Sequence, residues 1–440
     1  MGGCYKYRIE QPFNELRRFD VDYRTTAFLP NNLHEPQTDT LVRWVEQSDL
    51  VVLQRCFMYE IFQRLRLACT IAGRKLVFES DDDYLNLDPY NPCYAELNKP
   101  GVLEGFKNIL READQVWVST QELKDIYYPF NHNIKVIPNN VKEVNMFRDE
   151  HMQHIGPDGK VQINEVFGFV TYPSYVQFPT PDNQVRVEKL FRVGYTATPT
   201  HRVDFQTIQP HFEKFLKKFP NTTVIYQGDP WFPQVGHPPE HKNVIFIPNQ
   251  PHDLYMQNMR NYDVGIAPLM PTIFNMSKSP LKLLEYASWG IPAVAPRFIT
   301  YERTFKNSDT AMLYQNGREF YEMLCHLAEN PEEVKRLGLN AAKMVHETRT
   351  EKVNAQERFD AQTVSRIFRK VNVNSPKQVK QMLKEMGMKV PTKAGSETVN
   401  KESLAKLRKS YPKEDVLKDL VSINKLNSQM ETYFNFKYDE

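Results

Sequence analysis

The chain has 440 residues, more than one hydrophobic core usually organises, so its length predicts two domains and an additional segment. Hydrophobic residues make up 41% and charged residues 25%, a composition that excludes a largely disordered chain. The net charge is +2, but residues 371–440 hold 13 Lys and Arg against 9 Asp and Glu, so the basic excess lies at the end of the sequence. A solvated helical surface is the favoured explanation of that excess on charge alone, and a polyanionic partner is the alternative.

The sequence also bears on the compartment in which the protein works. No apolar run approaches the roughly 20 residues that span a bilayer, and the polar start MGGCYKYRIEQ lacks the apolar region of a signal peptide. Five cysteines are widely spread and show no C-x-x-C spacing of the kind that binds zinc. We therefore expect a cytoplasmic protein with reduced thiols that is neither secreted nor inserted in a membrane.

Short apolar segments alternate with helical patterns through the first 350 residues. The segments predicted as strands are 50–55, 75–80, 115–120, 135–140, 190–197, 222–229, 243–249, 263–269 and 291–296. Turn residues and a helical stretch follow the strands, as at 120–128 and 205–219. This alternation of strands and helices is typical of βα units on parallel sheets. It predicts an α/β protein with two doubly wound, Rossmann-like domains, at residues 1–150 and 188–370.

Two further segments do not show this alternation of strands and helices. Residues 151–187 are rich in Pro, Gly and aromatic residues, and the alternating run VFGFVTY predicts a hairpin. We interpret this segment as an inter-domain insertion, which either extends the structure or lines an acceptor site with its aromatic residues. Residues 371–440 predict a small helical appendage with helices at 401–410 and 414–433.

The segment FNMSKSPLKLLEYASWGIPAVAP, at 274–296, has the strongest chemical pattern. Ser279 predicts a helix N-cap, the proline after it suits the first helical position, and Gly290 predicts the end of the helix. Lys278 precedes this helix, while Lys282 and Glu285 are three residues apart and share a face. Two cations and the N–H groups of a helix start suit a diphosphate, and Glu285 suits ribose hydroxyls. From these residues alone, an ordinary surface salt pair remains an alternative.

Three blocks of the sequence resemble retaining glycosyltransferases of the GT-B fold, in glycosyltransferase group 1 or family 4. The first has the pattern F-N-x-x-K-S-x-x-K-x-x-E-Y-x-x-x-G-x-P and is carried by Phe274, Asn275, Lys278, Ser279, Lys282, Glu285, Tyr286, Gly290 and Pro292. The second, RVGYTATPTHRVDF, ends in a T-H-x-x-D pattern carried by Thr200, His201 and Asp204, and the third covers residues 113–141. The resemblance implies two domains facing a cleft, a nucleotide-sugar co-substrate such as a UDP-sugar, no cofactor and no metal.

The resemblance also implies roles for particular residues. Lys278 and Lys282 would neutralise the departing diphosphate, and His201 would hydrogen-bond the diphosphate or the donor sugar. The residues expected to bind the donor are Gly2, Gly3, Thr196, Lys278, Ser279, Lys282 and Glu285. The sequence departs from the family at two places: Ser277 stands where many members have a first glutamate, and no strand precedes the Gly-rich start.

The acidic run ESDDDYLNLDP follows the strand predicted at 75–80. Asp81 and Asp83 match the D-x-D motif of metal-using glycosyltransferases of another fold, but we reject that interpretation. In related GT-B enzymes a D-D-D run closes a strand of the first domain and faces the cleft. We therefore expect Asp82 to act as a base-like catalytic group, with Asp81 and Asp83 on the acceptor side and no metal ligand among them. A helix-capping acidic turn is the alternative.

Residues 371–440 resemble part of the thumb region of family A DNA polymerases. The residues that carry this resemblance are Asn374, Ser375, Lys377, Gln378, Thr392, Lys393, Gly395, Lys425, Leu426 and Tyr433. The resemblance does not include the polymerase palm and its metal-binding carboxylates, so we expect no polymerisation activity. The resemblance implies contacts with the duplex DNA backbone by Asn374, Ser375, Lys377 and Lys393.

Three hypotheses about function follow. The first is a glycosyltransferase that modifies a hydroxymethylated base in phage DNA, working in the host cytoplasm, where the target base is reached in a groove or flipped out. The second is a glycosyltransferase for a surface polysaccharide, a lipid-linked glycan or a protein, with an inert tail. The third is a DNA-binding protein on a degenerate transferase scaffold. Oligomeric state does not follow from the sequence.

Overall fold

The computed structural model describes residues 3–144 and 191–360, apart from 20, 24–41, 230–240 and 242. It also describes the backbone of four short strands within 163–189 and short stretches between 379 and 411. By internal contacts the chain forms two compact units. One consists of Met1–Thr25, Leu53–Phe62 and Phe78–Arg358, and the other of Thr26–Val52, Gln63–Val77 and Phe359–Glu440. The first unit contains every described residue that the sequence predicted for catalysis, the donor or the acceptor side.

The first sheet has four strands in the order β1-β2-β3-β4. They are β1 (Leu50–Gln54), β2 (Lys75–Ser80), β3 (Gln115–Val118) and β4 (Ile134–Val136). The helices that connect them are α4 (Tyr59–Ile71), α5 (Tyr94–Leu97), α6 (Pro100–Glu112) and α7 (Gln121–Tyr127). The apolar centres of β2 and β3 are fully buried, which explains why these strands read as continuous apolar runs. Thr120 caps α7 by accepting a hydrogen bond from the backbone N–H of Leu123.

The N-terminal segment is helical rather than a loop. It contains α1 (Gly3–Tyr5), the π-helical segment η1 (Lys6–Glu10), α2 (Gln11–Leu16) and the 3-10 segment η2 (Arg17–Phe19). Within η1 the side chains of Tyr7 and Arg8 are both 2% exposed. A π-helical turn is rare and often lies at a functional site.

The second sheet has six parallel strands in the order β11-β10-β9-β12-β13-β14. They are β9 (Arg192–Ala197), β10 (Thr223–Gly228), β11 (Val244–Pro248), β12 (Val264–Ile266), β13 (Ala293–Pro296) and β14 (Met312–Tyr314). The chain runs outward from β9 through β10 to β11 and then returns to the other side of β9 at β12. Such a switch point is where open α/β sheets bind ligands, beyond the carboxyl ends of the strands.

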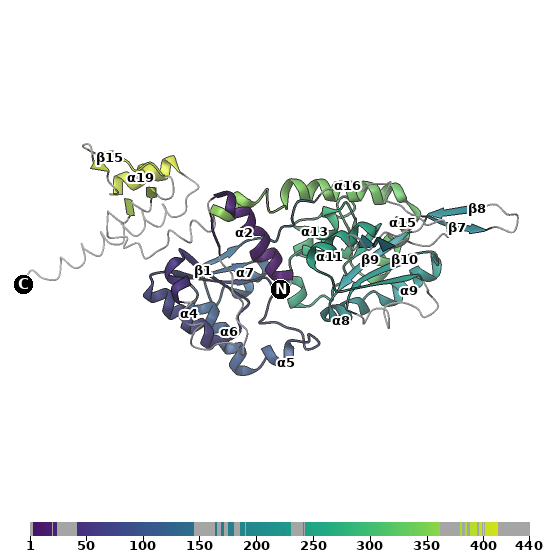
Figure 1. Ribbon diagram of the computed structural model, residues 1–440, viewed down its shortest axis with the longest axis horizontal. Coiled ribbons are helices and arrows are strands. Elements are labelled where there is room, and N and C mark those ends of the chain that lie inside the picture. The colour runs from purple at the N-terminus through teal and green to yellow at the C-terminus, as the bar shows by residue number, and fades with distance from the viewer. Residues whose placement is uncertain are drawn as a thin grey trace, which may run out of the picture. The chain divides into compact units, whose positions relative to one another are not determined.

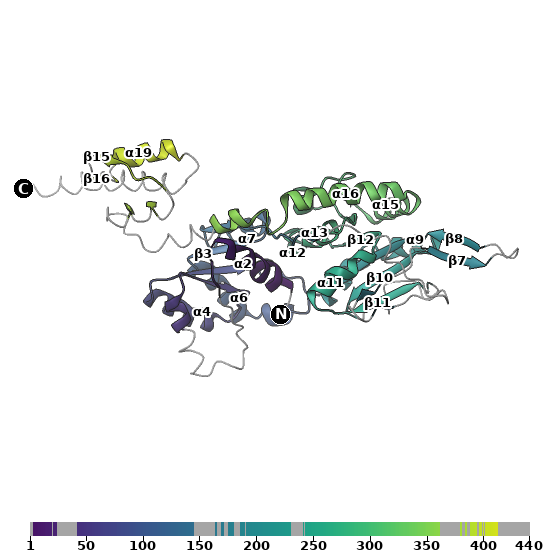
Figure 2. The same cartoon turned by 45° about the horizontal axis from the view of Figure 1, so that its top comes forward.

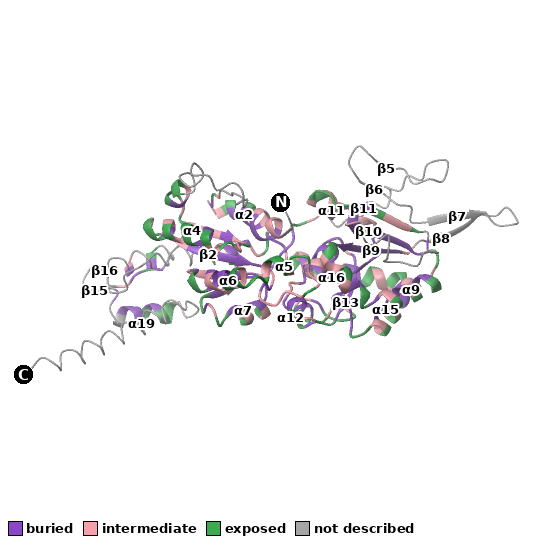
Figure 3. Ribbon diagram, turned by 90° about the horizontal axis from the view of Figure 1, so that it is seen from below, coloured by how far each residue is buried: buried purple, intermediate pink, exposed green. Residues whose placement is uncertain are grey.

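Helices cover this second sheet. They are α8 (Arg202–Gln206), α9 (Gln209–Lys218), α11 (His252–Asn258), α12 (Ile273–Met276), α13 (Leu281–Ser288), α14 (Ile299–Glu302), α15 (Gly317–Glu329) and α16 (Pro331–Thr348). Helix α16 packs beside α13, as Figures 1 and 2 show. Figure 3 shows β9 and β10 as buried strands and α9 with an exposed side, the pattern expected of a sheet covered by amphipathic helices.

All nine predicted strands are present, and the structure adds the short strand β14. The helix predicted at 205–219 is instead the pair α8 and α9, because Pro210 cannot continue a helix and starts α9 in its first turn. In the predicted insertion, β6 (Phe169–Val170) lies within VFGFVTY but pairs with the preceding β5 (Ile163–Asn164). A second antiparallel pair joins β7 (Tyr175–Pro179) and β8 (Val185–Lys189).

The predicted appendage contains α19 (Lys401–Ser410), which confirms the helix predicted there. A short antiparallel pair, β15 (Thr392–Lys393) and β16 (Ser396–Glu397), precedes it. The helix predicted at 414–433 lies outside the described residues. So do the predicted domain boundaries after 150 and 370, whereas the boundary predicted between 187 and 188 falls inside β8.

Close packing at Gly194 gives a testable stability effect. A Cβ atom at this position of β9 would lie 2.0 Å from Cδ2 of the fully buried Tyr262 ring. We expect Gly194→Ala to lower the free energy of unfolding in urea by about 3 kcal/mol, because overpacking displaces the ring or the strand. Gly101→Ala is the control, since a Cβ there meets no atom within 4 Å. Its free energy of unfolding should be unchanged or slightly higher. Equal effects of the two substitutions would contradict this packing.

Candidate functional site

The carboxyl ends of β9 and β12 bring two of the sequence motifs together through Asp204. His201 Nδ1 donates to Asp204 Oδ2 at 2.8 Å, and Asn275 Nδ2 donates to Asp204 Oδ1 at 2.7 Å. The backbone N–H of Met270 donates to the same Oδ1 at 2.8 Å. Asp204 is 1% exposed. Through these hydrogen bonds its buried carboxylate holds His201 and the loop before α12 in place.

These contacts set the tautomer of His201. Because a carboxylate only accepts hydrogen bonds, Nδ1 carries the proton and Nε2 of the neutral ring is left as an acceptor. Burial lowers the pKa of His201, and the nearby charge of Lys278 lowers it further. The ring is therefore neutral at pH 7, suited to accept a hydrogen bond from a hydroxyl group.

The lowered pKa of His201 predicts a loss of stability in acid. Below pH 6.5 the unfolded chain binds a proton at this position while the folded ring stays neutral, so folding becomes less favourable as the pH falls. Between pH 7 and pH 5 we expect the wild type to lose about 1 kcal/mol more of unfolding free energy than His201→Gln. Urea denaturation of both proteins at the two pH values measures the difference. A larger acid loss in the variant would contradict it.

Helix α13 is shorter than predicted and begins at Leu281. Pro280 occupies the N-cap position and Ser279 does not cap the helix, because its Oγ instead accepts a hydrogen bond from Asn139 Nδ2 at 2.8 Å. Gly290 follows the helix with a φ of +68°, as its predicted role at the helix end requires. Ser279 thus joins the end of the β4 segment to the start of α13.

Lys282 and Glu285 share a face of α13, as predicted, and form an ion pair at 2.9 Å. Glu285 is 3% exposed, and both its oxygens accept further hydrogen bonds. Oε1 accepts from Tyr7 Oη at 2.7 Å, and Oε2 accepts from Tyr255 Oη at 2.7 Å. Lys282 Nζ also contacts Tyr255 Oη. The carboxylate therefore lies inside a closed polar cluster, not on a surface.

Lys278 lies near the start of this helix and close to the acidic run. Its Nζ stands 4.7 Å from the centre of the Phe274 ring. Burial raises the pKa of Asp82, the charge of Asp81 adds to the rise, and Lys278 and Arg55 oppose it. Lys278 therefore belongs to one electrostatic environment with His201 and Asp82, three residues that the sequence predicted as catalytic.

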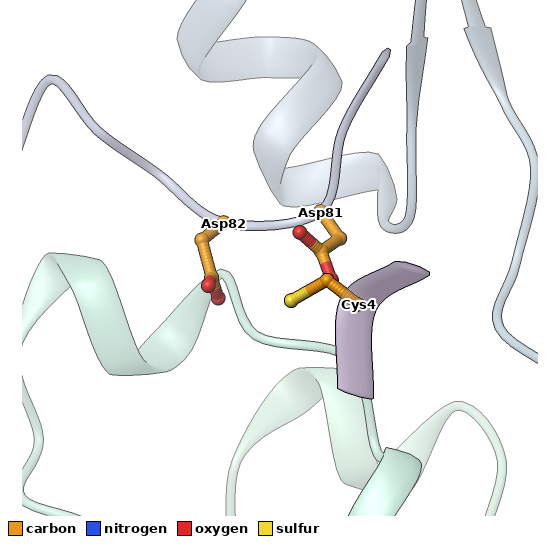
Figure 4. Close-up of side chains that lie close together, drawn as sticks. All are labelled: Cys4, Asp81 and Asp82. Atoms are coloured by element: carbon orange, nitrogen blue, oxygen red, sulfur yellow. The ribbon is translucent and has the colours of Figure 1, made fainter. Parts of the chain in front are cut away.

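Two of the three aspartates converge with a cysteine from the N-terminal segment. Figure 4 shows Cys4, Asp81 and Asp82 pointing toward one another, and within the described part of the chain their ligand atoms lie within 4.8 Å of each other. Arg55, whose φ of 50° is unusual for a residue with a side chain, donates from Nη1 to Cys4 Sγ at 3.1 Å. Burial, followed by the charge of Asp81, raises the pKa of the Cys4 thiol, so this sulfur is protonated beside the carboxylates.

Asp83 does not join this group. It is fully buried, and its oxygens accept hydrogen bonds from the backbone N–H of Leu85 at 3.0 Å and from Asn86 Nδ2 at 2.8 Å. These contacts are those of an acidic turn, but the turn caps no described helix, so they match only part of the alternative that the sequence left open. The structure thus separates Asp83, as a turn residue, from Asp81 and Asp82.

The remaining predicted residues have varied positions. Thr196 is 3% exposed at the end of β9, and its hydroxyl lies 3.2 Å from Tyr286 Oη. Gly3 begins α1, while Gly2 lies outside the described residues. Of the residues predicted to bind DNA, the backbone of Lys393 lies in β15, and Asn374, Ser375 and Lys377 lie outside the described residues.

Sequence reasoning missed Tyr7, Tyr255 and His252, which surround Glu285. His252 Nε2 lies 2.7 Å from Tyr7 Oη, and the two rings meet edge to face. No local pattern marks these residues, because Tyr7 and Glu285 are 278 positions apart. The role of Asp204 was partly signalled by its place in the T-H-x-x-D pattern.

Comparisons with known proteins bear on the family and the fold. Residues 210–360, less than half of the chain, match a family model described as glycosyl transferase-like. No curated protein matches the sequence. Among the described residues, no helix has both the length and the apolar character needed to cross a bilayer.

Several solved structures share the fold. Anabaena HepE in complex with UDP and glucose is 16% identical, with a TM-score of 0.51 over 75% of this chain and 81% of HepE. HepE in complex with UDP-glucose is 15% identical, with a TM-score of 0.50 over 83% of this chain and 90% of HepE. A glycosyltransferase from Rickettsia africae is 12% identical, with a TM-score of 0.50 over 80% and 87%. The chain therefore has an α/β fold with two parallel-sheet domains, the architecture of GT-B glycosyltransferases.

Proposed function

We propose that this protein is a glycosyltransferase that moves a sugar from a UDP-sugar to a hydroxyl group. The observation that carries the proposal is the Lys282–Glu285 pair on α13, next to Lys278, at the carboxyl edge of the second sheet. The family match over 210–360 includes this helix, and the HepE structures contain UDP and UDP-glucose. Glu285 would accept hydrogen bonds from the ribose hydroxyls, and the two lysines would hold the diphosphate.

Charge neutralisation is the main catalytic device in this proposal. As the bond between the anomeric carbon and the phosphate oxygen breaks, its electron pair stays with the diphosphate, where negative charge grows. Lys278 and Lys282, held by the fold before the reaction starts, would stabilise that charge without costly reorganisation. His201, neutral and oriented by Asp204, would accept a hydrogen bond from a hydroxyl of the donor sugar.

The acceptor side of the reaction is assigned to Asp82. The positive charges of Lys278 and Arg55 stabilise its carboxylate, which belongs to the group in Figure 4. Asp82 would accept a hydrogen bond from the acceptor hydroxyl, aim the hydroxyl oxygen at the anomeric carbon, and take the hydroxyl proton as the new bond forms. We propose attack on the face that the diphosphate leaves, with retention, because residues 274–292 resemble the donor helix of retaining enzymes. Proton NMR of the first product formed measures the anomeric configuration.

Metal independence is a further part of the proposal. We expect EDTA to leave the transfer rate unchanged, since the lysine ammonium groups supply the positive charge that a metal would otherwise bring to the diphosphate. Rates with EDTA and with added Mg²⁺ or Mn²⁺ check this. Metal independence would be contradicted if EDTA abolished activity and Mg²⁺ or Mn²⁺ restored it. Cys4, Asp81 and Asp82 would then be the candidate metal ligands.

For the acceptor we propose a hydroxymethylated base in DNA. Support comes from the net positive charge of residues 371–440 and from their resemblance to a polymerase thumb. Duplex affinity should then fall steeply with salt, and Lys377→Ala with Lys393→Ala should reduce both the affinity and the salt slope. Absence of duplex binding, together with sugar transfer to a polysaccharide, lipid-linked or protein acceptor, would favour the alternative with an inert tail.

Donor binding tests the proposal directly. We expect wild-type protein to bind UDP and UDP-glucose in calorimetric titrations and Glu285→Gln to bind them at least about tenfold more weakly, because a charged hydrogen-bond acceptor is lost. Glu322→Gln is the matched control, since Glu322 is an exposed partner of Arg318 on α15. Equal affinities in Glu285→Gln and wild type would remove Glu285 from the donor site.

A further inference from the structure

The Glu285 carboxylate is closed off by groups from two parts of the chain. Tyr255 on α11 and Lys282 on α13 belong to the second sheet domain and both contact Oε2. Tyr7, from the N-terminal segment η1, donates to Oε1. Glu285 and Tyr7 are 3% and 2% exposed, so in this arrangement the carboxylate is closed to solvent.

Counting hydrogen bonds shows that this arrangement cannot hold a ribose diol at Glu285. A carboxylate offers about four lone-pair positions, and Tyr7, Tyr255 and Lys282 use three of them. One position is left, whereas a ribose diol bound through both hydroxyls needs two. At least one of the three present partners must therefore move away before a nucleoside can be held in this way.

Displacing Tyr7 from Glu285 disturbs the second domain less than displacing Tyr255 or Lys282 would. Tyr255 and Lys282 are built into the same domain as Glu285, and Lys282 has a third N–H group that can bind a phosphate while its ion pair remains. Tyr7 comes from another segment. Its neighbour Arg8 is fixed to the first sheet domain by a buried ion pair with Glu79 and a 2.9 Å hydrogen bond to Asn139 Oδ1. Moving Tyr7 away from Glu285 therefore separates the N-terminal segment from α13.

His252 holds the Tyr7 side chain in this position. Because the only hydroxyl proton of Tyr7 is donated to Glu285, His252 Nε2 must donate to the Tyr7 oxygen at 2.7 Å. Tyr7 is thus an acceptor toward one group and a donor toward another, as a ribose hydroxyl would be in the same place. The Tyr7 hydroxyl therefore takes the position that a ligand hydroxyl would have.

We propose that Tyr7 is the gate of the donor site: its hydroxyl occupies the ribose position at Glu285 when no donor is bound, and the nucleotide displaces it. This inference rests on the proposed function, because it takes Glu285 as the ribose-binding residue. Donor binding then costs the Tyr7–Glu285 hydrogen bond, and affinity is lower than the site alone would give.

Substitution of the gate hydroxyl tests the inference. Tyr7→Phe keeps the ring and removes the competing hydroxyl, so its Kd for UDP should be about fivefold lower than that of the wild type, the effect of one hydrogen bond. Tyr226→Phe is the matched control, because Tyr226 is also buried and its hydroxyl donates to the carbonyl oxygen of Ala197 and not to Glu285. Its Kd should equal the wild-type value. Unchanged or weaker UDP binding by Tyr7→Phe overturns the gate.

A measurement on the wild type covers the case in which Tyr7→Phe does not fold. Hydrogen exchange with and without UDP should show faster exchange of amides in Gly3–Leu16 and slower exchange in α13 when UDP is bound. Slower exchange in both segments would overturn the gate. The two ideas fail differently: normal UDP binding by Glu285→Gln contradicts the ribose assignment itself, whereas weak binding by that variant with no change in Tyr7→Phe contradicts the gate alone.

Discussion

Lys282→Ala is expected to lower kcat/KM for sugar transfer by about a hundredfold to a thousandfold, the usual effect of removing one preorganised group that stabilises transition-state charge. Lys282 lies within hydrogen-bond distance of Glu285 and Tyr255, so its position is fixed before a substrate arrives. Most of the loss should appear in kcat, because the charge on the diphosphate grows as the glycosidic bond breaks. Initial rates over a range of donor concentrations give both constants.

The control for this substitution is Lys352→Ala. Lys352 is an exposed lysine that pairs with Glu143 at 3.0 Å, so its loss removes the same charge from a different place. Its kinetic constants should match those of the wild type. If Lys282→Ala keeps the wild-type circular dichroism and melting temperature and also transfers sugar at the wild-type rate, the assignment of the donor site to α13 is wrong.

Arg8→Met is expected to destabilise the fold by about 3–5 kcal/mol, because it leaves the buried carboxylate of Glu79 without its cation. Both side chains of this ion pair are 1% exposed. Arg8 also donates to the carbonyl oxygen of Ile137 and to Asn139 Oδ1, so the N-terminal segment is anchored to the end of β4. Urea denaturation measures the free energy of unfolding.

The double variant Arg8→Met with Glu79→Met separates charge from packing. Replacing both partners removes the isolated charge, so the double variant should be more stable than Arg8→Met alone. A double variant whose loss equals the sum of the two single losses would mean that Arg8 and Glu79 act independently. That result would also contradict the role that we assign to Arg8 in anchoring the N-terminal segment.

The strands and the donor helix could be predicted because their signals are local. Each predicted strand is a short apolar run next to turn residues, and the spacing of Lys282 and Glu285 places both on one helical face whatever the tertiary structure. Strand β14 (Met312–Tyr314) was not predicted, although it is no shorter than β4 and β12, which were predicted.

The contacts around the site could not be predicted in the same way. Ser279 had the chemistry of an N-cap, but Asn139, 140 residues away in the chain, donates to its hydroxyl. Asp81, Asp82 and Asp83 look alike in sequence, and only their neighbours distinguish the turn residue Asp83 from the other two. Likewise, nothing near Glu285 in the chain indicates Tyr7. Tertiary contacts decide what these side chains do, and one sequence does not encode them locally.

The most direct test of the account is to incubate the protein with a panel of UDP- and GDP-sugars and hydroxymethylated duplex DNA. Release of the nucleoside diphosphate and the masses of the digested nucleosides are then measured together. We predict that a UDP-sugar is consumed and that its sugar appears on the hydroxymethylated nucleoside, with both signals lost in Lys282→Ala. If no nucleotide-sugar is bound or cleaved with this or any other hydroxyl acceptor, the protein is not a glycosyltransferase.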